Sequence, residues 1–305
     1  DQPRSRGLGD VYKRQEDTYI PEGDVAVKIS LTGLKGGHSG VDIHLGRANA
    51  NKLMFRFLKE AVRDYGARLS SIDGGSLRNA IPREAFAIIT IPGDNVEALW
   101  ELVSDYQEMY RSEYKGIEHN INFTAEMTDM PATLIPEEIQ DDLINAIEGC
   151  QNGVISMLVD FPGTVESSTN LAIVKSSNEM IEIQILVRSS SESRKEAVCS
   201  SLESIFSLAG AKVEYSDGYG GWQPNIDSPI LKIMQQAYLD LYGKKPEAKV
   251  MHAGLECGII QESYPDMDMI SIGPDLQHPH SPDERVSIPS VARTWGFIVT
   301  TLARI

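Results

Sequence analysis

Cysteine is scarce in this sequence, and long hydrophobic runs are missing from it. The 305 residues include three widely spaced cysteines, Cys150, Cys199 and Cys257, and none belongs to a CxxC pair. This spacing excludes a disulfide framework and a cysteine-rich zinc finger, and it favours a reducing, cytoplasmic location. No apolar run approaches the roughly 20 residues that a membrane span needs, so we expect no membrane partner.

Positive charge is also in short supply. The chain has 28 Lys and Arg against 44 Asp and Glu, which gives a formal net charge of −16. Without a basic patch to neutralise phosphates, a nucleic-acid partner is not expected. The hydrophobic content of 41% and charged content of 24% are typical of a soluble globular protein. The length indicates about two domains.

The first 15 residues differ in character from the rest. They read DQPRSRGLGDVYKRQ, which is basic and aperiodic in an otherwise acidic chain. We interpret residues 1–15 as a non-native tail and leave them out of the fold. A short disordered native tail is the alternative, and in either case we expect order to begin near Asp24.

Residues 16–217 show the pattern of an α+β domain. The order strand–helix–strand–helix–strand is followed by a weaker recurrence of the same elements, and it predicts helices on one face of a mostly antiparallel sheet. Residues 70–75 read as a turn. The expected strands are 25–31, 85–91, 120–127, 168–174, 180–187 and 212–215, and the expected helices are 47–65, 95–114, 139–150 and 193–209.

Residues 218–305 begin with a glycine-rich stretch and then show an α/β alternation. We expect helices at 230–242, from 255, and at 289–303, with strands at 249–252 and 269–272. The segment has too few strands to form a sheet that is covered on both faces. It is therefore predicted to be part of a larger α/β domain.

His38 is the first candidate functional residue. It lies in the run GLKGGHSG, where neighbouring glycines let the backbone approach a ligand closely. An imidazole can donate a proton or a hydrogen bond near neutral pH. His38 is therefore a candidate for metal binding or acid–base chemistry.

A second histidine run lies near the C-terminus. His280 stands in a loop stiffened by Pro279 and Pro282, which suits a metal ligand, although a surface histidine is the alternative. Gly254, in the run HAGLECG, indicates a strand-to-helix turn whose backbone N–H groups suit an anion or carbonyl, or else a packing turn.

Two polar residues between these runs are weaker candidates. Asn79 precedes a predicted strand and Arg188 ends another. Amide and guanidinium groups suit a substrate carbonyl or carboxylate, but a turn-forming Asn and a surface Arg are the alternatives. The two histidine runs together indicate a metal-assisted hydrolase. The sequence contains no HExxH motif, so most of the metal site is missing from it.

Four motifs together resemble one family. LTGLKGGHSGVDIHLGRANANKLM, SLRNAIPREA, HAGLECG and IGPDLQHPHSPDERVSI are similar to the aminoacyl-histidine dipeptidases, within the zinc-dependent aminoacylase and carboxypeptidase family. The resemblance implies a two-domain metallopeptidase with a di-zinc catalytic domain and an inserted lid. Residues 16–217 would be the lid or dimerisation domain with its lead-in. Residues 218–305 would be the C-terminal part of the α/β zinc-peptidase catalytic domain.

The same resemblance implies roles for individual residues. His280 matches a zinc ligand, and His38 matches a lid histidine that binds the substrate carbonyl and stabilises the oxyanion. Asn79 and Arg188 match lid residues that hold the substrate, including its C-terminal carboxylate. Gly254 matches a backbone contact. An intact site would hold two Zn²⁺ ions, and the chain retains one of their ligands.

The family's N-terminal catalytic segment has no counterpart in this sequence. We therefore expect an N-terminally truncated dipeptidase that is inactive alone, from a parent that hydrolyses Xaa-His and other dipeptides. A related tripeptidase or N-acyl amino acid hydrolase, and a non-catalytic dimerisation or binding module, are the alternatives. A homodimer formed through the lid is expected from the resemblance.

Overall fold

The computed structural model describes residues 7–13, 17–159, 161–177, 179–216, 225, 227–249, 256–277 and 284–305. The chain divides near residue 219 into two compact units. Among the described residues, no helix is both long enough and apolar enough to cross a membrane.

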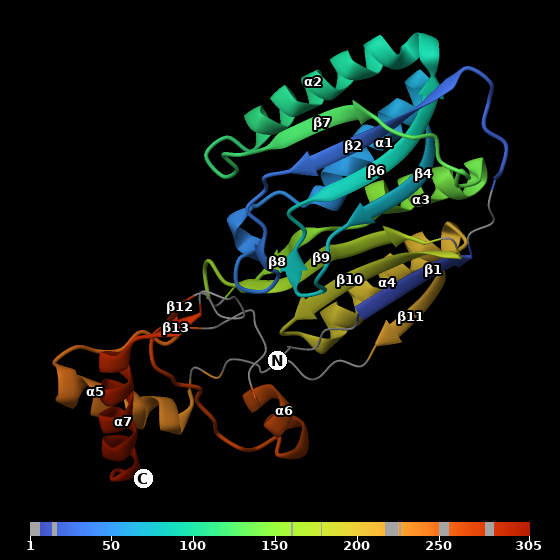
Figure 1. Cartoon of the computed structure of the whole chain (residues 1–305). Coiled ribbons are helices and arrows are strands. Elements are labelled where there is room, and N and C mark those ends of the chain that lie inside the picture. The colour runs from blue at the N-terminus through green and yellow to red at the C-terminus, as the bar shows by residue number, and fades with distance from the viewer. Residues whose placement is uncertain are drawn as a thin grey trace. The chain divides into compact units, whose positions relative to one another are not determined.

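The first unit is built on one antiparallel sheet (Figure 1). In its described part the strand order is β11-β1-β10-β9-β4-β6-β2-β7, with β8 paired to β9. The strands are β1 Gly7–Lys13, β2 Asp24–Thr32, β4 Arg68–Gly74, β6 Ala85–Pro92, β7 Asn122–Met127, β8 Gly153–Met157, β9 Val165–Ser176, β10 Met180–Ser189 and β11 Lys212–Ser216.

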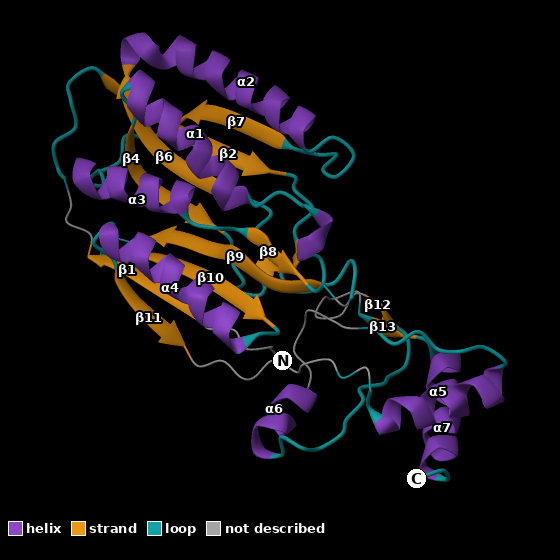
Figure 2. Cartoon of the chain, turned by 180° about the vertical axis from the view of Figure 1, so that it is seen from behind, coloured by secondary structure: helices purple, strands orange, loops and turns teal. Residues whose placement is uncertain are grey.

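Helices cover one face of this sheet. Figure 2 shows α1 (Ala50–Tyr65), α3 (Glu137–Gly149) and α4 (Glu192–Leu208) on the same side of the strands. α2 (Val96–Glu113) lies beside α1, where the ring of Tyr106 meets Phe57 edge-on at 5.4 Å. The predicted α+β architecture, with helices on one face of an antiparallel sheet, is confirmed for this unit.

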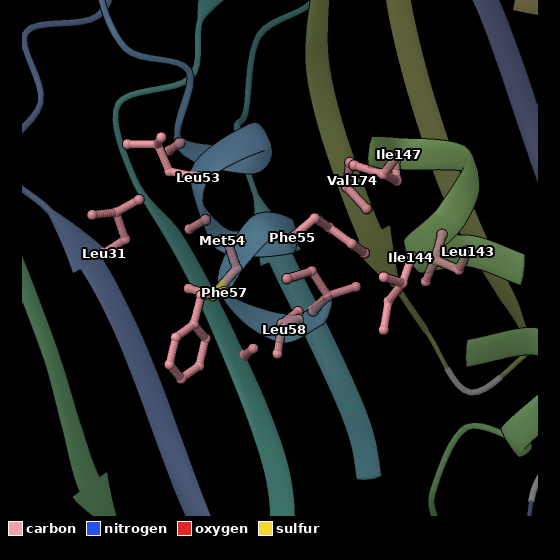
Figure 3. Packing of buried hydrophobic residues seen from close by; sticks show 14 of the residues in the cluster. Leu31, Leu53, Met54, Phe55, Phe57, Leu58, Leu143, Ile144, Ile147 and Val174 are labelled. Carbon is pink, nitrogen blue, oxygen red and sulfur yellow. The ribbon is translucent and has the colours of Figure 1, made fainter. Parts of the chain in front are cut away.

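The core lies between α1 and the strands behind it. Leu53, Phe57 and Ala61 share one face of α1 and are 4%, 0% and 0% exposed, as their helical spacing predicts. Figure 3 shows this face together with Leu31 from β2, and with residues of α3 on the other side of the helix. Burial of this apolar surface fixes α1 against the sheet.

Two predicted boundaries in this unit were wrong. α1 begins at Ala50, not at residue 47, because the Asn49 side chain accepts a hydrogen bond from Lys52 N at 3.2 Å and caps the helix. Residues 70–75, expected to form a turn, mostly belong to β4. Leu69 and Ile72 are buried there, and β6 and β9 pair with the strand, so tertiary packing overrides the turn preference of Ser, Asp and Gly.

The composition predicted that residues 1–15 lie outside the fold, and for residues 7–13 this prediction is wrong. They form β1, which pairs antiparallel with β10 on one side and β11 on the other. Backbone hydrogen bonds carry this pairing, so it does not require the alternating apolar pattern that the segment lacks.

The second unit has a small core. α5 (Pro229–Tyr242) packs on α7 (Ile288–Leu302) through Met234, Ala237 and Phe297. The remaining described elements are α6 (Glu256–Ser263) and the antiparallel pair of β12 (Leu276–Gln277) and β13 (Arg285–Val286).

The expected strand at 269–272 is wrong. These residues have no regular secondary structure, and Ile272 is 41% exposed. In the described part of the chain no strand pairs with them, so their β-propensity has no ladder to complete. Most of the expected strand at 249–252 lies outside the described residues.

Candidate functional site

A two-strand ribbon beside the main sheet carries the first two candidates. β3 (Gly37–His38) pairs antiparallel with β5 (Ala80–Ile81), so that His38 faces Ala80. The next residue, Ser39, donates its backbone N–H to the carbonyl oxygen of Asn79 at 2.8 Å. His38 and Asn79 are 41 positions apart in the sequence, and this ribbon brings their backbones together.

Arg188 joins the same cluster from the end of β10. Its Nε and Nη2 each donate to the Oγ of Ser39 at 3.3 Å. Arg188 is 1% exposed and Ser39 is also 1% exposed, so the guanidinium is enclosed by protein rather than placed on the surface. The three lid residues singled out from the sequence therefore meet around one buried serine.

The imidazole of His38 is held by its own turn. Its Nδ1 accepts hydrogen bonds from the backbone N–H groups of Gly40 at 3.1 Å and Val41 at 3.0 Å. A nitrogen that accepts in this way carries no proton, so the proton of the neutral ring lies on Nε2. His38 is thereby set up as a hydrogen-bond donor through Nε2.

An ion pair between Asp42 and Arg47 contacts the backbone of this turn. The carboxylate of Asp42 accepts the backbone N–H of His38 at 2.9 Å, and Arg47 Nη1 lies 3.2 Å from Asp42 Oδ2. Arg47 Nη1 also donates to the carbonyl oxygen of Gly36 at 2.6 Å. Gly37, at φ +142°, leaves the space that the pair occupies, since a Cβ there would lie 2.3 Å from Arg47 Nη1.

A buried glutamate ties both ends of the segment that carries His38. Glu118 is 4% exposed, and its two carboxylate oxygens accept from Lys35 N at 2.8 Å and from Ala48 N at 3.2 Å. A carboxylate taken out of water needs such partners. Glu118 therefore closes the 35–48 segment into a loop with fixed ends.

The turn that carries Asn79 is fixed from β9. Asn170 is 1% exposed, and its Nδ2 donates to the carbonyl oxygen of Ala80 at 2.8 Å. Asn79 itself is half-buried in the turn before β5. Its position is therefore set by backbone contacts on both sides, to Ser39 and through Ala80.

Two predicted site residues, Gly254 and His280, lie outside the described residues. Within the described ranges, no group of three or more His, Cys, Asp or Glu side chains could hold a metal ion. The described residues alone therefore do not form the metal site that the sequence resemblance implies.

Sequence reasoning missed four residues of this cluster: Ser39, Asp42, Arg47 and Glu118. The first three stand within nine positions of His38, so their proximity was available as a signal. Glu118 lies 70 positions from Ala48, and no pattern in the sequence connects the two.

The chain is similar to known proteins in both sequence and structure. Residues 29–118, which run from β2 to the end of α2 and past it, match the family model of the peptidase dimerisation domain. The chain is 42% identical over 286 residues to the cytosol non-specific dipeptidase of Escherichia coli, covering 94% of this chain and 59% of that protein. The crystal structure of aminoacylhistidine dipeptidase from Vibrio alginolyticus is 40% identical, with a TM-score of 0.90, and covers 100% of this chain and 62% of that one.

These matches define the first unit as carrying a peptidase dimerisation domain. They also support the resemblance found in the sequence: the chain is similar to a cytosol non-specific dipeptidase and to an aminoacylhistidine dipeptidase. The chain spans about six-tenths of the length of these two relatives, 59% and 62%.

Proposed function

We propose that this chain is the lid and the C-terminal catalytic segment of a zinc-dependent dipeptidase that hydrolyses Xaa-His and other dipeptides. The observation that carries the proposal is the 42% identity to a cytosol non-specific dipeptidase across 94% of the chain. The meeting of His38, Asn79 and Arg188 around Ser39 also supports it, because these are the residues to which the family resemblance gives substrate-binding roles.

His38 acts in this proposal as an electrophilic donor. With Nδ1 occupied by two backbone N–H groups, its Nε2–H is the group that can donate to the carbonyl oxygen of the scissile peptide. Negative charge grows on that oxygen as water adds to the carbonyl. A preorganised donor of this kind contributes roughly 3–4 kcal/mol to lowering the barrier.

Asn79 and Arg188 have the task of orienting the dipeptide. The Asn79 amide suits a carbonyl or carboxylate oxygen, and a guanidinium recognises a terminal carboxylate through two parallel hydrogen bonds. Two fork nitrogens of Arg188 are already directed at Ser39 Oγ. In this proposal Ser39 holds the guanidinium in register for the substrate.

The metal belongs to the part of the site that the described residues do not contain. His280 is proposed as a zinc ligand and Gly254 as a backbone contact to the substrate, each from the family resemblance. A zinc pair, when bound, would polarise the peptide carbonyl and activate water. A cytoplasmic location is proposed from the scarce cysteines, and the Escherichia coli relative is named as a cytosol protein.

A homodimer through the lid is the proposed assembly. The match to a dimerisation domain over residues 29–118 supports it. β7, at one end of the strand order, pairs only with β2 among the described strands, so part of its outer edge is available to a partner; Phe123 N–H on this strand donates instead to Gln107 Oε1 at 3.0 Å. Light scattering during gel filtration would show twice the 33.6 kDa monomer mass, and a monomer at all concentrations would contradict the assembly.

Hydrolysis assays test the proposed activity. The protein expressed from the complete gene with added zinc is expected to cleave Ala-His and β-Ala-His, and to prefer them to tripeptides and N-acyl amino acids. Preference for tripeptides or N-acyl amino acids would move the substrate to the related hydrolases. Lack of cleavage of all three classes by the complete protein would overturn the enzyme proposal.

A further inference from the structure

The segment between residues 36 and 47 contains an ion pair, Asp42–Arg47, that contacts the backbone on both sides of His38. Asp42 and Arg47 are each about a quarter exposed, at 26% and 23%, so their pair is partly shielded from water. Exposed pairs contribute about 0–1 kcal/mol, so stability alone is a weak reason to bury this one. Its contacts converge instead on the backbone on either side of the histidine.

We propose that the Asp42–Arg47 pair is a positioning device for His38 and keeps its imidazole in the Nε2–H form. Asp42 accepts the His38 backbone N–H at 2.9 Å through Oδ2, and its own backbone N–H donates to the His38 carbonyl oxygen at 2.9 Å. These two bonds close the turn whose middle N–H groups, those of Gly40 and Val41, reach His38 Nδ1.

Arg47 fixes the other side of the histidine. One nitrogen, Nη1, contacts both the Asp42 carboxylate at 3.2 Å and the Gly36 carbonyl oxygen at 2.6 Å. The pair therefore holds the backbone before His38 and the backbone after it with a single charged bridge. Loss of either charge frees the turn, and the two N–H groups that keep Nδ1 unprotonated can then move away.

The glycine at position 37 is a consequence of the same arrangement. A Cβ on Gly37 would lie 2.3 Å from Arg47 Nη1 and 2.7 Å from Asp42 Oδ2. Only a residue without a side chain lets the ion pair approach the ribbon this closely. The Gly-Gly-His order is thus matched to the pair beneath it.

The proposal concerns which ring nitrogen of His38 carries the proton. It rests on the proposed function only for what the Nε2–H group does, which is to donate to the substrate. The test is a long-range ¹H–¹⁵N spectrum of the ¹⁵N-histidine-labelled 305-residue chain, with the His38 signals assigned by their loss in His38→Ala. Wild type is expected to show one neutral ring with the proton on Nε2. Asp42→Ala and Arg47→Met are expected to lose that single pattern and show a mixture of ring forms.

Two further variants test whether the effect depends on the charge of Asp42 and on this particular ion pair. Asp42→Asn keeps an acceptor for His38 N but loses the charge, and is expected to fall between wild type and Asp42→Ala. Glu113→Gln removes a comparable lid ion pair, to Arg56 at 2.8 Å, and is expected to leave His38 unchanged. Should Asp42→Ala not fold, Asp42→Asn and Arg47→Met, each of which removes one charge of the pair, provide the same comparison.

An unchanged His38 spectrum in the folded Asp42 and Arg47 variants would overturn the proposal. So would a wild-type ring with its proton on Nδ1. The outcome is separable from the activity, because a single Nε2–H form in wild type, together with a complete protein that cleaves no dipeptide, would sustain the positioning role and remove the proposed function.

Discussion

Ser39 Oγ lies 3.3 Å from both Nε and Nη2 of Arg188, and both residues are 1% exposed. This contact spans 149 positions of sequence and joins the end of β10 to the ribbon that carries His38. One small hydroxyl therefore connects a buried cation to the turn of a histidine and, through its backbone N–H, to Asn79.

Replacement of Ser39 by alanine is expected to destabilise the fold. Ser39→Ala removes an acceptor from the buried Arg188 guanidinium while leaving the backbone bond to Asn79 in place, and the loss is expected to be about 1–3 kcal/mol. Urea unfolding measures it. Ser204→Ala is the matched control, since Ser204 is exposed on α4 and its hydroxyl donates to Ser200 O within the same helix. Equal effects of the two changes would contradict the role given to Ser39.

Glu118→Gln tests the two hydrogen bonds that hold the ends of the 35–48 segment. The amide is the same size as the carboxylate, but one of its two ends is an NH₂ group that would face a backbone N–H, either of Lys35 or of Ala48. We expect a loss of about 1–3 kcal/mol in the free energy of unfolding. Glu126→Gln, on an exposed residue 3.4 Å from Lys28 Nζ, is the control and should change little.

Gly75→Ala is expected to disrupt the end of β4. Gly75 has φ +76°, and a Cβ there would lie 1.9 Å from the carbonyl oxygen of Ala172, which is backbone and cannot swing away. Gly116→Ala separates strain from collision, because Gly116 has φ +86° with nothing within 4 Å. The control is expected to lose about 1–2 kcal/mol from its left-handed backbone alone. Gly75→Ala should lose more, and equal thermal shifts would refute the collision.

High pH is expected to destabilise the first unit through its buried tyrosines. Burial raises the pKa of Tyr110, and burial and the hydrogen bond to Glu60 raise the pKa of Tyr106. Above about pH 10 the unfolded chain loses these phenol protons while the folded chain keeps them. The unfolded state then binds fewer protons, so the free energy of unfolding falls as the pH rises.

Thermal melts between about pH 9 and pH 11 measure this effect, with absorbance at 295 nm reporting phenolate formation. Tyr110→Phe removes one of the linked protons, so its Tm should fall less steeply than that of wild type across this range. Tyr19→Phe, at a residue 71% exposed, should follow wild type. Identical pH slopes for all three proteins would show that the buried phenols do not cause the loss.

Much of the first unit could be predicted because its elements carry strong local patterns. The spacing of Leu53, Phe57 and Ala61 defines the buried face of α1, and alternation in 25–31 defines β2. β4 could not be found in this way. Its Ser, Asp and Gly residues favour turns locally, and the strand exists because β6 and β9 pair with it.

The site was predicted in part for a similar reason. His38 stands out because of its glycines, and the family resemblance supplies Asn79 and Arg188. The buried Ser39 and Glu118 act through hydrogen bonds to groups far away in the sequence, at separations of 149 and 83 positions. Such contacts follow from the tertiary fold and leave no periodic trace in the sequence.

The central claim, that His38 is a donor to the substrate carbonyl and not a metal ligand, is tested most directly by His38→Ala in the protein expressed from the complete gene. The kcat for Ala-His should fall by roughly 10²–10³ while zinc content by elemental analysis is unchanged. His119→Ala, at an exposed position on the same lid, should leave both values as in wild type. A loss of zinc in His38→Ala, or an unaltered kcat, would contradict the account.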